Sequence, residues 1–248
     1  MPRGFAADAD AKAHTFVDRL DPTLTITGDD GHHLTRVRRL RAGDALTAAD
    51  GSGVWRRYVV RDALDGSLTA TAEPGDEPVE EPLASPPLAV AFALTKGQKP
   101  AGVVRALTEL GVDRVLPVSS ARSVVRRDAR RSAEATSRLR VVAREAACQC
   151  RRARLPEIVG EAPLDRLQPA SGTVVLAAQR DARSAPVPPA GRPGWLLVVG
   201  PEGGLEPSEL AALGPDGVVG VGPHVLRAPT AAVAATAVLV RERWRRRS

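Results

Sequence analysis

The sequence predicts an α/β protein in which a small β-rich module precedes a parallel sheet with helices on both faces. After residue 87, apolar runs typical of buried strands alternate with helical stretches. Before residue 73, short apolar runs alternate with turn residues. Between them, EPGDEPVEEPLASPP holds five prolines and five acidic residues and little that could join a core. We therefore expect a β domain at 1–75, a linker at 76–87 and an α/β domain at 88–248.

The N-terminal module contains four stretches that predict short strands. They are LTIT, GDALTAADGSG, WRRYVVRDAL and SLTATAEP. Between the first two lies GHHLTRVRRLRAGD, in which Leu34, Val37 and Leu40 recur at helical spacing. Cationic residues, among them His33, Arg36, Arg38 and Arg39, occupy the positions between them. This face is either solvated or contacts a phosphate backbone, and both interpretations stay open.

After the linker, the expected elements follow one another in a regular order. Strands are predicted at PLAVAFALTKG, RVLPVSS, GTVVLAAQ, GWLLVVG and GVVGVG. Helices are predicted at PAGVVRALTELG, at 128–149, at PSELAALG and at PTAAVAATAVLVRERWRRR. Ligands of such sheets bind beyond the carboxyl ends of the strands, where the glycine-bearing turns 200–204 and 220–223 lie.

Charge points to a polyanionic partner. The formal net charge is +6 and the pI is near 10.2. Between Arg122 and Arg154 stand eleven arginines against three acidic residues, a density that favours phosphate contacts over a mixed solvated face. Four scattered histidines and two cysteines give no metal-binding spacing, so no metal is expected. No apolar run reaches the ~18 residues of a membrane span, so a cytoplasmic location is expected.

The turn GPEGG is not a triphosphate loop. A Walker-type loop needs lysine followed by serine or threonine after its last glycine, whereas Leu205, Glu206 and Pro207 follow Gly204 here. Glu202 inside the turn would also repel a triphosphate. The chain also lacks G-x-G-x-x-G after the first strand of the α/β domain, which argues against a nucleotide-binding enzyme with a small-molecule substrate.

Five stretches in register carry a family resemblance. They are HHLTRVRRLRAGD, TKGQKPAGVVRALTELGV, REAACQCRRARLPEI, GPEGG and VGPHVLRAPTA. Together they resemble the bacterial enzymes that methylate N3 of a uridine in 16S ribosomal RNA, which belong to the SPOUT superfamily. The resemblance extends over nearly the whole chain. It implies an N-terminal PUA-like barrel, a deep C-terminal trefoil knot, a homodimer with RNA across its interface, and the small ribosomal subunit as partner.

The resemblance also implies the cofactor, S-adenosylmethionine, with S-adenosylhomocysteine as product. Main-chain groups of three loops would hold it. The expected cofactor-binding residues are Leu176, Ala177, Ala178, Gly200, Pro201, Glu202, Gly203, Gly204, Val221, Gly222, Val225, Leu226, Arg227 and Thr230. The expected RNA-binding residues are His33, Arg36, Arg38, Arg39, Arg122, Arg126, Arg127, Arg151 and Arg154.

The expected catalytic residues are Arg152, Arg227 and Glu202. Uracil N3 becomes nucleophilic only when its proton leaves, and a guanidinium would stabilise the negative charge on the uracil oxygens. Arginine is always protonated and is a poor base, so the base stays unnamed. Arg152 and Arg227 are either such groups or members of surface ion pairs. Glu202 either orients the turn through backbone amides, which is the favoured role, or contacts the substrate.

Two departures from the family keep alternatives open. Members commonly read Arg-Thr-Glu-Thr-Ala where this chain has Arg227-Ala228-Pro229-Thr230-Ala231, and arginine where it has His224. A hydroxyl and a carboxylate are missing, which weakens the expected cofactor contacts. The alternatives are a non-catalytic RNA-binding assembly factor with a decayed cofactor loop, and a SPOUT methyltransferase that acts on another RNA.

Overall fold

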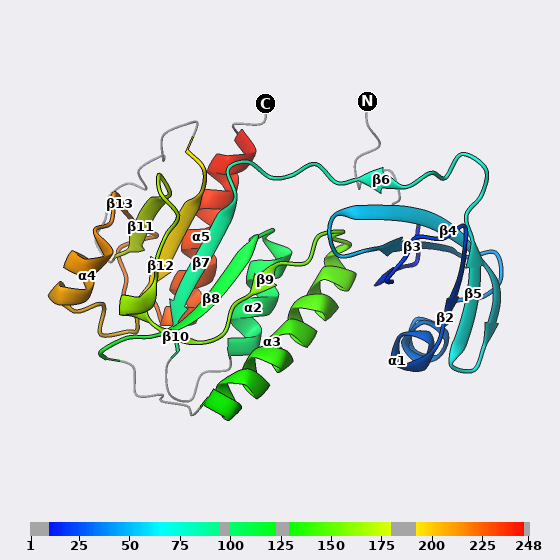
Figure 1. Cartoon of the computed structure of the whole chain (residues 1–248), viewed down its shortest axis with the longest axis horizontal. Coiled ribbons are helices and arrows are strands. Elements are labelled where there is room, and N and C mark those ends of the chain that lie inside the picture. The colour runs from blue at the N-terminus through cyan, green and yellow to red at the C-terminus, as the bar shows by residue number, and fades with distance from the viewer. Residues whose placement is uncertain (1–9, 95–99, 123–128, 180–191, 246–248) are drawn as a thin grey trace. The chain divides into compact units, whose positions relative to one another are not determined.

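Figure 1 shows the computed structural model of the chain, which describes residues 10–94, 100–122, 129–179 and 192–245. The chain divides into two compact units. The first consists of Met1–Leu83 and Arg144–Leu155, and the second of Ala84–Ala143 and Pro156–Ser248. The first unit is therefore discontinuous in sequence, because it takes in a segment from the middle of the chain.

Six strands form the sheet of the first unit, in the order β1-β3-β4-β5-β2, with β6 paired to β4. Their bounds are β1 Ala13–Phe16, β2 Thr23–Ile26, β3 Ala45–Ala49, β4 Val54–Leu64, β5 Ser67–Thr71 and β6 Val79–Glu80. Neighbours are antiparallel except β1 and β3. A register shift between Val60 and Asp62 gives β4 a bulge, which sharpens its bend. Leu46, Tyr58 and Leu68 lie in the buried core of this unit.

The basic stretch of the first unit is not the regular helix that its spacing predicts. Helix α1 spans Gly28–His32 and continues as the π-helix η2, His33–Val37. Leu34 and Leu40 are buried as expected, whereas the Val37 side chain is 62% exposed. A π-helical turn takes more residues than an α-helical one, so positions three apart no longer share a face. The prediction that Val37 faces the core is therefore wrong.

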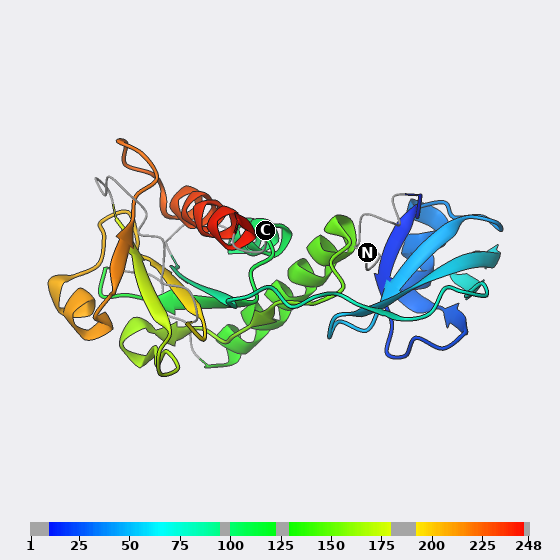
Figure 2. The same cartoon turned by 90° about the horizontal axis from the view of Figure 1, so that it is seen from above.

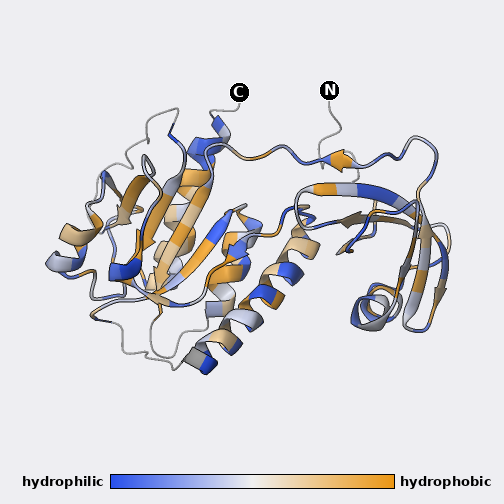
Figure 3. Cartoon of the chain, viewed as in Figure 1, coloured by the Kyte–Doolittle hydropathy of each residue, from blue (hydrophilic) through white to orange (hydrophobic). Residues whose placement is uncertain are grey.

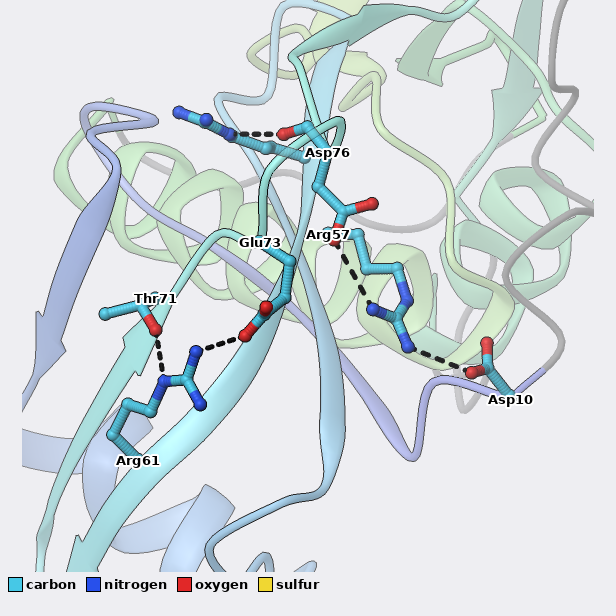
Figure 4. Close-up of polar contacts among 7 residues, drawn as sticks. Asp10, Arg57, Arg61, Thr71, Glu73 and Asp76 are labelled. Atoms are coloured by element: carbon cyan, nitrogen blue, oxygen red, sulfur yellow. Dashed lines mark hydrogen bonds and ion pairs between the residues drawn. The ribbon is translucent and has the colours of Figure 1, made fainter.

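Arginines of β4 are bonded inside the first unit, as Figure 4 shows. Arg57 donates to Asp10 Oδ2 at 3.0 Å and to Asp76 Oδ2 at 3.4 Å. The hydrogen bond from Arg57 lowers the pKa of the Asp10 carboxyl. Arg61 donates to Glu73 at the end of β5. These guanidiniums are engaged with acidic neighbours, so the number of arginines overstates how many are free to bind phosphate.

The end of α3, Ala129–Cys150, packs into the first unit. Arg144 donates to both carboxylate oxygens of Asp30, at 2.9 and 2.8 Å, in a bidentate ion pair. Its guanidinium carbon lies 5.6 Å from the centroid of the Phe16 ring. Ala147 and Ala153 are buried in the same cluster as Phe16. The end of this helix is thus part of the core of the β unit.

Seven strands form the sheet of the second unit, in the order β10-β8-β7-β12-β11-β13, with β9 paired to β8. Their bounds are β7 Leu88–Ala93, β8 Arg114–Ser119, β9 Glu157–Ile158, β10 Ala162–Pro163, β11 Val174–Ala178, β12 Trp195–Val199 and β13 Gly217–Val219. Every pairing is parallel. Since all strands are parallel, their carboxyl ends lie at one edge of the sheet. Because β12 lies between β7 and β11, strands that are far apart in sequence are neighbours at that edge.

Helices cover both faces of this sheet (Figures 1 and 2). They are α2 Pro100–Glu109, α3, the 3-10 helix η3 Leu164–Arg166, α4 Pro207–Leu213 and α5 Ala228–Arg245. Along β12, Leu197 packs in the core with α2 and α5, whereas Leu196 packs on the opposite side with η3 and α4 residues. Figure 3 shows the consequence, strands that are hydrophobic along much of their length.

The predicted fold class is confirmed: a β-rich N-terminal module and a parallel α/β sheet. Each predicted strand and helix of the α/β region has a counterpart, with boundaries shifted by a few residues. The short strands β1, β6, β9 and β10 were missed, because two to four residues carry little periodicity. The domain boundaries and the trefoil knot stay predictions, although β6 lies inside the predicted linker and pairs with β4.

Candidate cofactor cavity and nucleic-acid interface

The end of β11 and the loops after β12 and β13 line a cavity of about 600 Å³ in the second unit. These are neighbouring parallel strands, so their carboxyl ends open at the same edge of the sheet. The start of α5 completes the wall. The lining residues are Ala178, Gln179, Val199, Gly200, Pro201, Glu202, Gly203, Gly204, Leu205, Leu210, Val219, Val221, Gly222, His224, Val225, Leu226, Ala228 and Ala231.

The turn after β12 forms one wall of the cavity. The Gly204 N–H donates to the Pro201 carbonyl at 2.8 Å, and Gly204 has a φ of 74°, a left-handed conformation that favours glycine. Helix α4 follows at once. It begins with a capping box in which the Glu206 and Glu209 carboxylates accept backbone N–H groups, and Pro207 stands at its start. The turn is thus fixed at one end by a strand and at the other by a capped helix.

Glu202 connects this turn to the start of α5. Its Oε1 accepts a hydrogen bond from the Ala228 N–H at 3.3 Å. A carboxylate near the first turn of a helix also interacts favourably with the helix dipole. This contact is compatible with the orienting role expected for Glu202, which stays a prediction. It places a carboxylate at the start of α5, next to Pro229.

Most of the expected cofactor-binding residues lie together around this cavity, but four do not line it. Ala178, the turn 200–204 and the expected positions among 221–226 are lining residues. Leu176 and Ala177 are buried within β11, each 1% exposed. Arg227 and Thr230 are exposed and are not lining residues.

Other lining residues were not among the expected cofactor-binding set. They are Gln179, Val199, Leu205, Leu210, Val219, His224, Ala228 and Ala231. Of these, His224 and Ala228 were noted only as departures from the family pattern. The rest are mostly apolar residues of strand ends and of α4 and α5, which look like ordinary core positions.

The lining of this cavity suits S-adenosylmethionine. Glu202 is the one carboxylate among the described residues that line it, and neutral backbone and apolar groups make up most of the rest. Apolar side chains and main-chain groups can contact an adenine, and a carboxylate suits the cationic sulfonium and ammonium. Val225 is 61% exposed although it is an apolar lining residue, which fits a site that a ligand covers. The residues present therefore fit this cofactor.

Arg122 lies beside the cavity turn. Its Nε donates to Glu206 Oε1 at 2.7 Å, and its Nη1 donates to the Gly203 carbonyl. Arg122 was expected to bind RNA; Arg126 and Arg127, expected to do the same, lie outside the described residues.

Another cavity of the second unit, of about 1110 Å³, lies on the far side of α4 and is lined by Ser208 and Glu209 among others.

The expected RNA-binding residues of the first unit lie on and after η2, and all are exposed. Arg36 forms an ion pair with Asp65, and Arg38 donates to the Lys12 carbonyl at 2.6 Å. His33 and Arg39 form no side-chain hydrogen bond with the described residues. Arg39 has a φ of 55°, a strained conformation for a residue other than glycine. The exposed surface of this region is therefore only partly available for phosphate.

The end of α3 places three expected arginines in the first unit. Arg151 donates to the Ala11 carbonyl and has a φ of 58° at the end of the helix. The Arg154 guanidinium lies against Gly53, since a Cβ there would be 2.1 Å from Arg154 Nη2. The Arg152 N–H donates to the Ala147 carbonyl at 2.9 Å, and its side chain is half-buried. Arg152 therefore belongs to the first unit, whereas the residues that line the cavity belong to the second.

Two general findings concern the described parts of the chain. No group of three or more His, Cys, Asp or Glu side chains among them could hold a metal ion. None of the described helices has both the length and the apolar character that crossing a membrane requires.

Comparisons with known proteins agree with this architecture. Residues 82–240 match the model of an RNA methyltransferase domain, and residues 26–73 match that of an RNA methyltransferase PUA domain. The ribosomal RNA small subunit methyltransferase E of Mycobacterium bovis is 37% identical over 244 residues, which are 92% of each chain. That of Bacillus subtilis is 31% identical over 224 residues, 85% of this chain and 86% of the relative.

A solved structure shares the fold. The ribosomal RNA small subunit methyltransferase E of Neisseria gonorrhoeae, bound to S-adenosylmethionine, matches with a TM-score of 0.75 at 22% identity. The match covers 92% of this chain and 96% of that one. The resemblance read from the motifs is thereby confirmed. This chain belongs to the RNA methyltransferase family that contains the ribosomal RNA small subunit methyltransferases E.

Proposed function

We propose that the protein is an S-adenosylmethionine-dependent methyltransferase that methylates N3 of one uridine in 16S ribosomal RNA. Its substrate is the assembled small ribosomal subunit, its location is the cytoplasm, and it works as a homodimer without a metal. The carrying observation is the cavity at the carboxyl edge of the second sheet, whose described lining is mostly neutral and includes the carboxylate of Glu202. Membership of the family and the PUA match at 26–73 support an RNA substrate.

The residues of the chain act by binding, orientation and charge. When bound, S-adenosylmethionine supplies an electrophilic methyl group on its sulfonium. The turn 200–204 and the loop 221–226 hold the ligand in one orientation, and alignment alone contributes several kcal/mol to catalysis. Arg227, exposed beside the cavity, and Arg152 are the candidates for stabilising negative charge on the uracil oxygens. Glu202 keeps the turn against the start of α5.

The test is methyl transfer from labelled S-adenosylmethionine to small subunits from a strain that lacks its N3-uridine methyltransferase. Free 16S RNA and large subunits serve as controls, and the modified base is mapped. We expect label at a single N3-methyluridine and only in assembled small subunits. Label in another RNA would contradict the proposed substrate while leaving the reaction class intact.

A specific observation favours a second function, that of a non-catalytic RNA-binding assembly factor. Ala228 and Pro229 replace a hydroxyl and a carboxylate at the start of α5, beside the cavity. The hydrogen bond from the Ala228 N–H to Glu202 places another carboxylate at the start of α5, which favours a site that can bind the cofactor. Calorimetry separates the two functions: we expect S-adenosylmethionine to bind, and no binding together with no methyl transfer would establish the RNA-binding factor.

A further inference from the structure

The loop after β8 is attached to the cavity turn by the Arg122 side chain. Arg122 Nε and Nη1 donate to two different acceptors, the Glu206 carboxylate and the Gly203 carbonyl. The side-chain stem packs on the turn as well, because a Cβ at Gly203 would lie 3.3 Å from Arg122 Cδ. Gly203 lines the cavity, so this arginine holds a wall of it from outside.

A second attachment runs in parallel through Glu209. Its Oε1 accepts from the Ala121 N–H at 2.7 Å, and its Oε2 accepts from the Glu206 N–H at 2.8 Å. The capping box that begins α4 is thus also bonded to the residue before Arg122. The contacts of Ala121 and Arg122 with Gly203, Glu206 and Glu209 are called the turn clamp below.

We propose that Arg122 is a positioning residue for the cofactor turn and does not contact RNA phosphate. The inference rests on the proposed function in that the cavity is taken to hold S-adenosylmethionine. A planar guanidinium presents donors in a fixed fork and can hold a carboxylate and a carbonyl at once. Two of its donor nitrogens are committed to the turn, so a phosphate contact would require breaking the clamp.

The clamp matters because the turn is proposed to bind S-adenosylmethionine through its main-chain groups. Backbone groups recognise a ligand only where the loop already has its bound shape, and ordering a loose loop on binding subtracts from affinity. The β12 end fixes the turn on one side, and the clamp fixes the other to the end of β8. Without Arg122, the turn keeps the Glu209 attachment and the hydrogen bond of Glu202 with Ala228, so we expect weaker cofactor binding rather than an unfolded site.

The experiment compares Arg122→Ala and Arg122→Lys with Arg138→Ala in the full-length protein. Arg138 is an exposed arginine of α3 whose side chain forms no hydrogen bond with the described residues, so Arg138→Ala removes the same charge without touching the turn. S-adenosylmethionine affinity is measured by calorimetry, and affinity for unmethylated small subunits is measured over a range of salt. We expect both Arg122 variants to lose about tenfold in cofactor affinity, since lysine cannot reproduce the fork. We expect Arg138→Ala to bind the cofactor like the wild type.

The salt dependence decides between clamp and phosphate contact. Log affinity for RNA falls as log salt rises. Losing one phosphate contact makes this slope shallower by about 1, and lysine restores it. An unchanged slope in Arg122→Ala with weakened cofactor binding supports the clamp. A slope that is shallower by about 1 in Arg122→Ala, or an unchanged cofactor affinity, overturns the clamp.

Failure of the proposed function is separable from failure of the clamp. If the wild type binds no S-adenosylmethionine, the cofactor assignment fails, and the clamp is judged by hydrogen exchange in the ligand-free protein. Faster exchange at Gly203–Glu206 in Arg122→Ala, but not in Arg138→Ala, supports the clamp. Equal exchange in the two variants overturns it.

Discussion

Several arginines that suggested RNA binding in the sequence are occupied by the protein itself. Arg243, in the basic C-terminal stretch, is 5% exposed and bonded to Asp113 at 2.7 Å. Arg144 is paired with Asp30, and Arg36 with Asp65. Residue counts give the total charge, but which guanidiniums are neutralised depends on partners that are distant in sequence. Arg39 is a better candidate for a phosphate contact, since it is exposed and forms no side-chain hydrogen bond within the described chain.

His14 gives the first unit a predictable dependence on pH. Burial lowers its pKa to about 4 from an ordinary 6.5. Between these values the unfolded chain binds a proton that the folded chain does not, so stability falls as pH drops from about 6.5 towards 4. We expect the free energy of unfolding to fall by about 1 kcal/mol between pH 7 and 5.5 through this group.

Urea unfolding of the wild type and His14→Gln at pH 7 and pH 5.5 measures this effect. In this interval few carboxylates titrate, so the difference between the two proteins isolates His14. The variant is expected to be less stable at pH 7, because it loses the hydrogen bond between His14 and Thr47, but to lose less on acidification. An equal loss in both proteins would contradict the prediction.

At the scale of elements, periodicity predicted the long strands and helices and failed where the backbone departs from a regular period. The run Leu34, Val37, Leu40 suggested one amphipathic face, but η2 turns Val37 outward. Strands β9 and β10 have two residues each and can be recognised only by their pairing with β8. The cavity itself was better predicted, because parallel strands place their following loops at one edge.

Two helical glycines should respond to alanine in opposite directions. A Cβ at Gly31, in α1, would lie 2.5 Å from the Gly66 carbonyl oxygen and 2.7 Å from that of Ile26. These are backbone atoms of the turn between β4 and β5 and of the end of β2, so we expect Gly31→Ala to destabilise the protein by about 1–3 kcal/mol. Gly102, in α2, has open space around it, and Gly102→Ala should stabilise by roughly 0.4–1 kcal/mol. Chemical denaturation measures both, and a stabilised Gly31→Ala would refute the crowding.

At the scale of the whole molecule, the assignment of residues to the two units could not be read from the sequence. The linker composition predicted a boundary near residue 80, but nothing in Arg144–Leu155 indicates that it belongs with the β unit. Its membership follows from tertiary contacts such as the burial of Ala147 and Ala153 with Phe16. A helix that begins in one unit and ends in the core of the other has no distinctive period or composition.

Ligand binding should therefore stabilise the two units unequally. S-adenosylmethionine at 100 times its Kd stabilises the state that binds it by about 2.7 kcal/mol. Since the cavity is made by second-unit residues, we expect slower amide exchange in β11 and β12, with little change in β3 to β5. Hydrogen-exchange mass spectrometry with and without the cofactor measures this. Equal protection in both sheets would contradict it.

The insertion of β12 between β7 and β11 also determines when the cavity can exist during protein synthesis. Strands β7 and β8 can pair as soon as they leave the ribosome, because they are adjacent in both sequence and sheet. Strand β11 emerges without its neighbour and must wait for Trp195–Val199 before it can join them. A nascent chain that stalls before Val199 therefore lacks the strand that joins β11 to β7, and the loops after β12 and β13 that line the cavity are not yet made. The cavity can form only once the chain has been synthesised as far as Ala231 in α5.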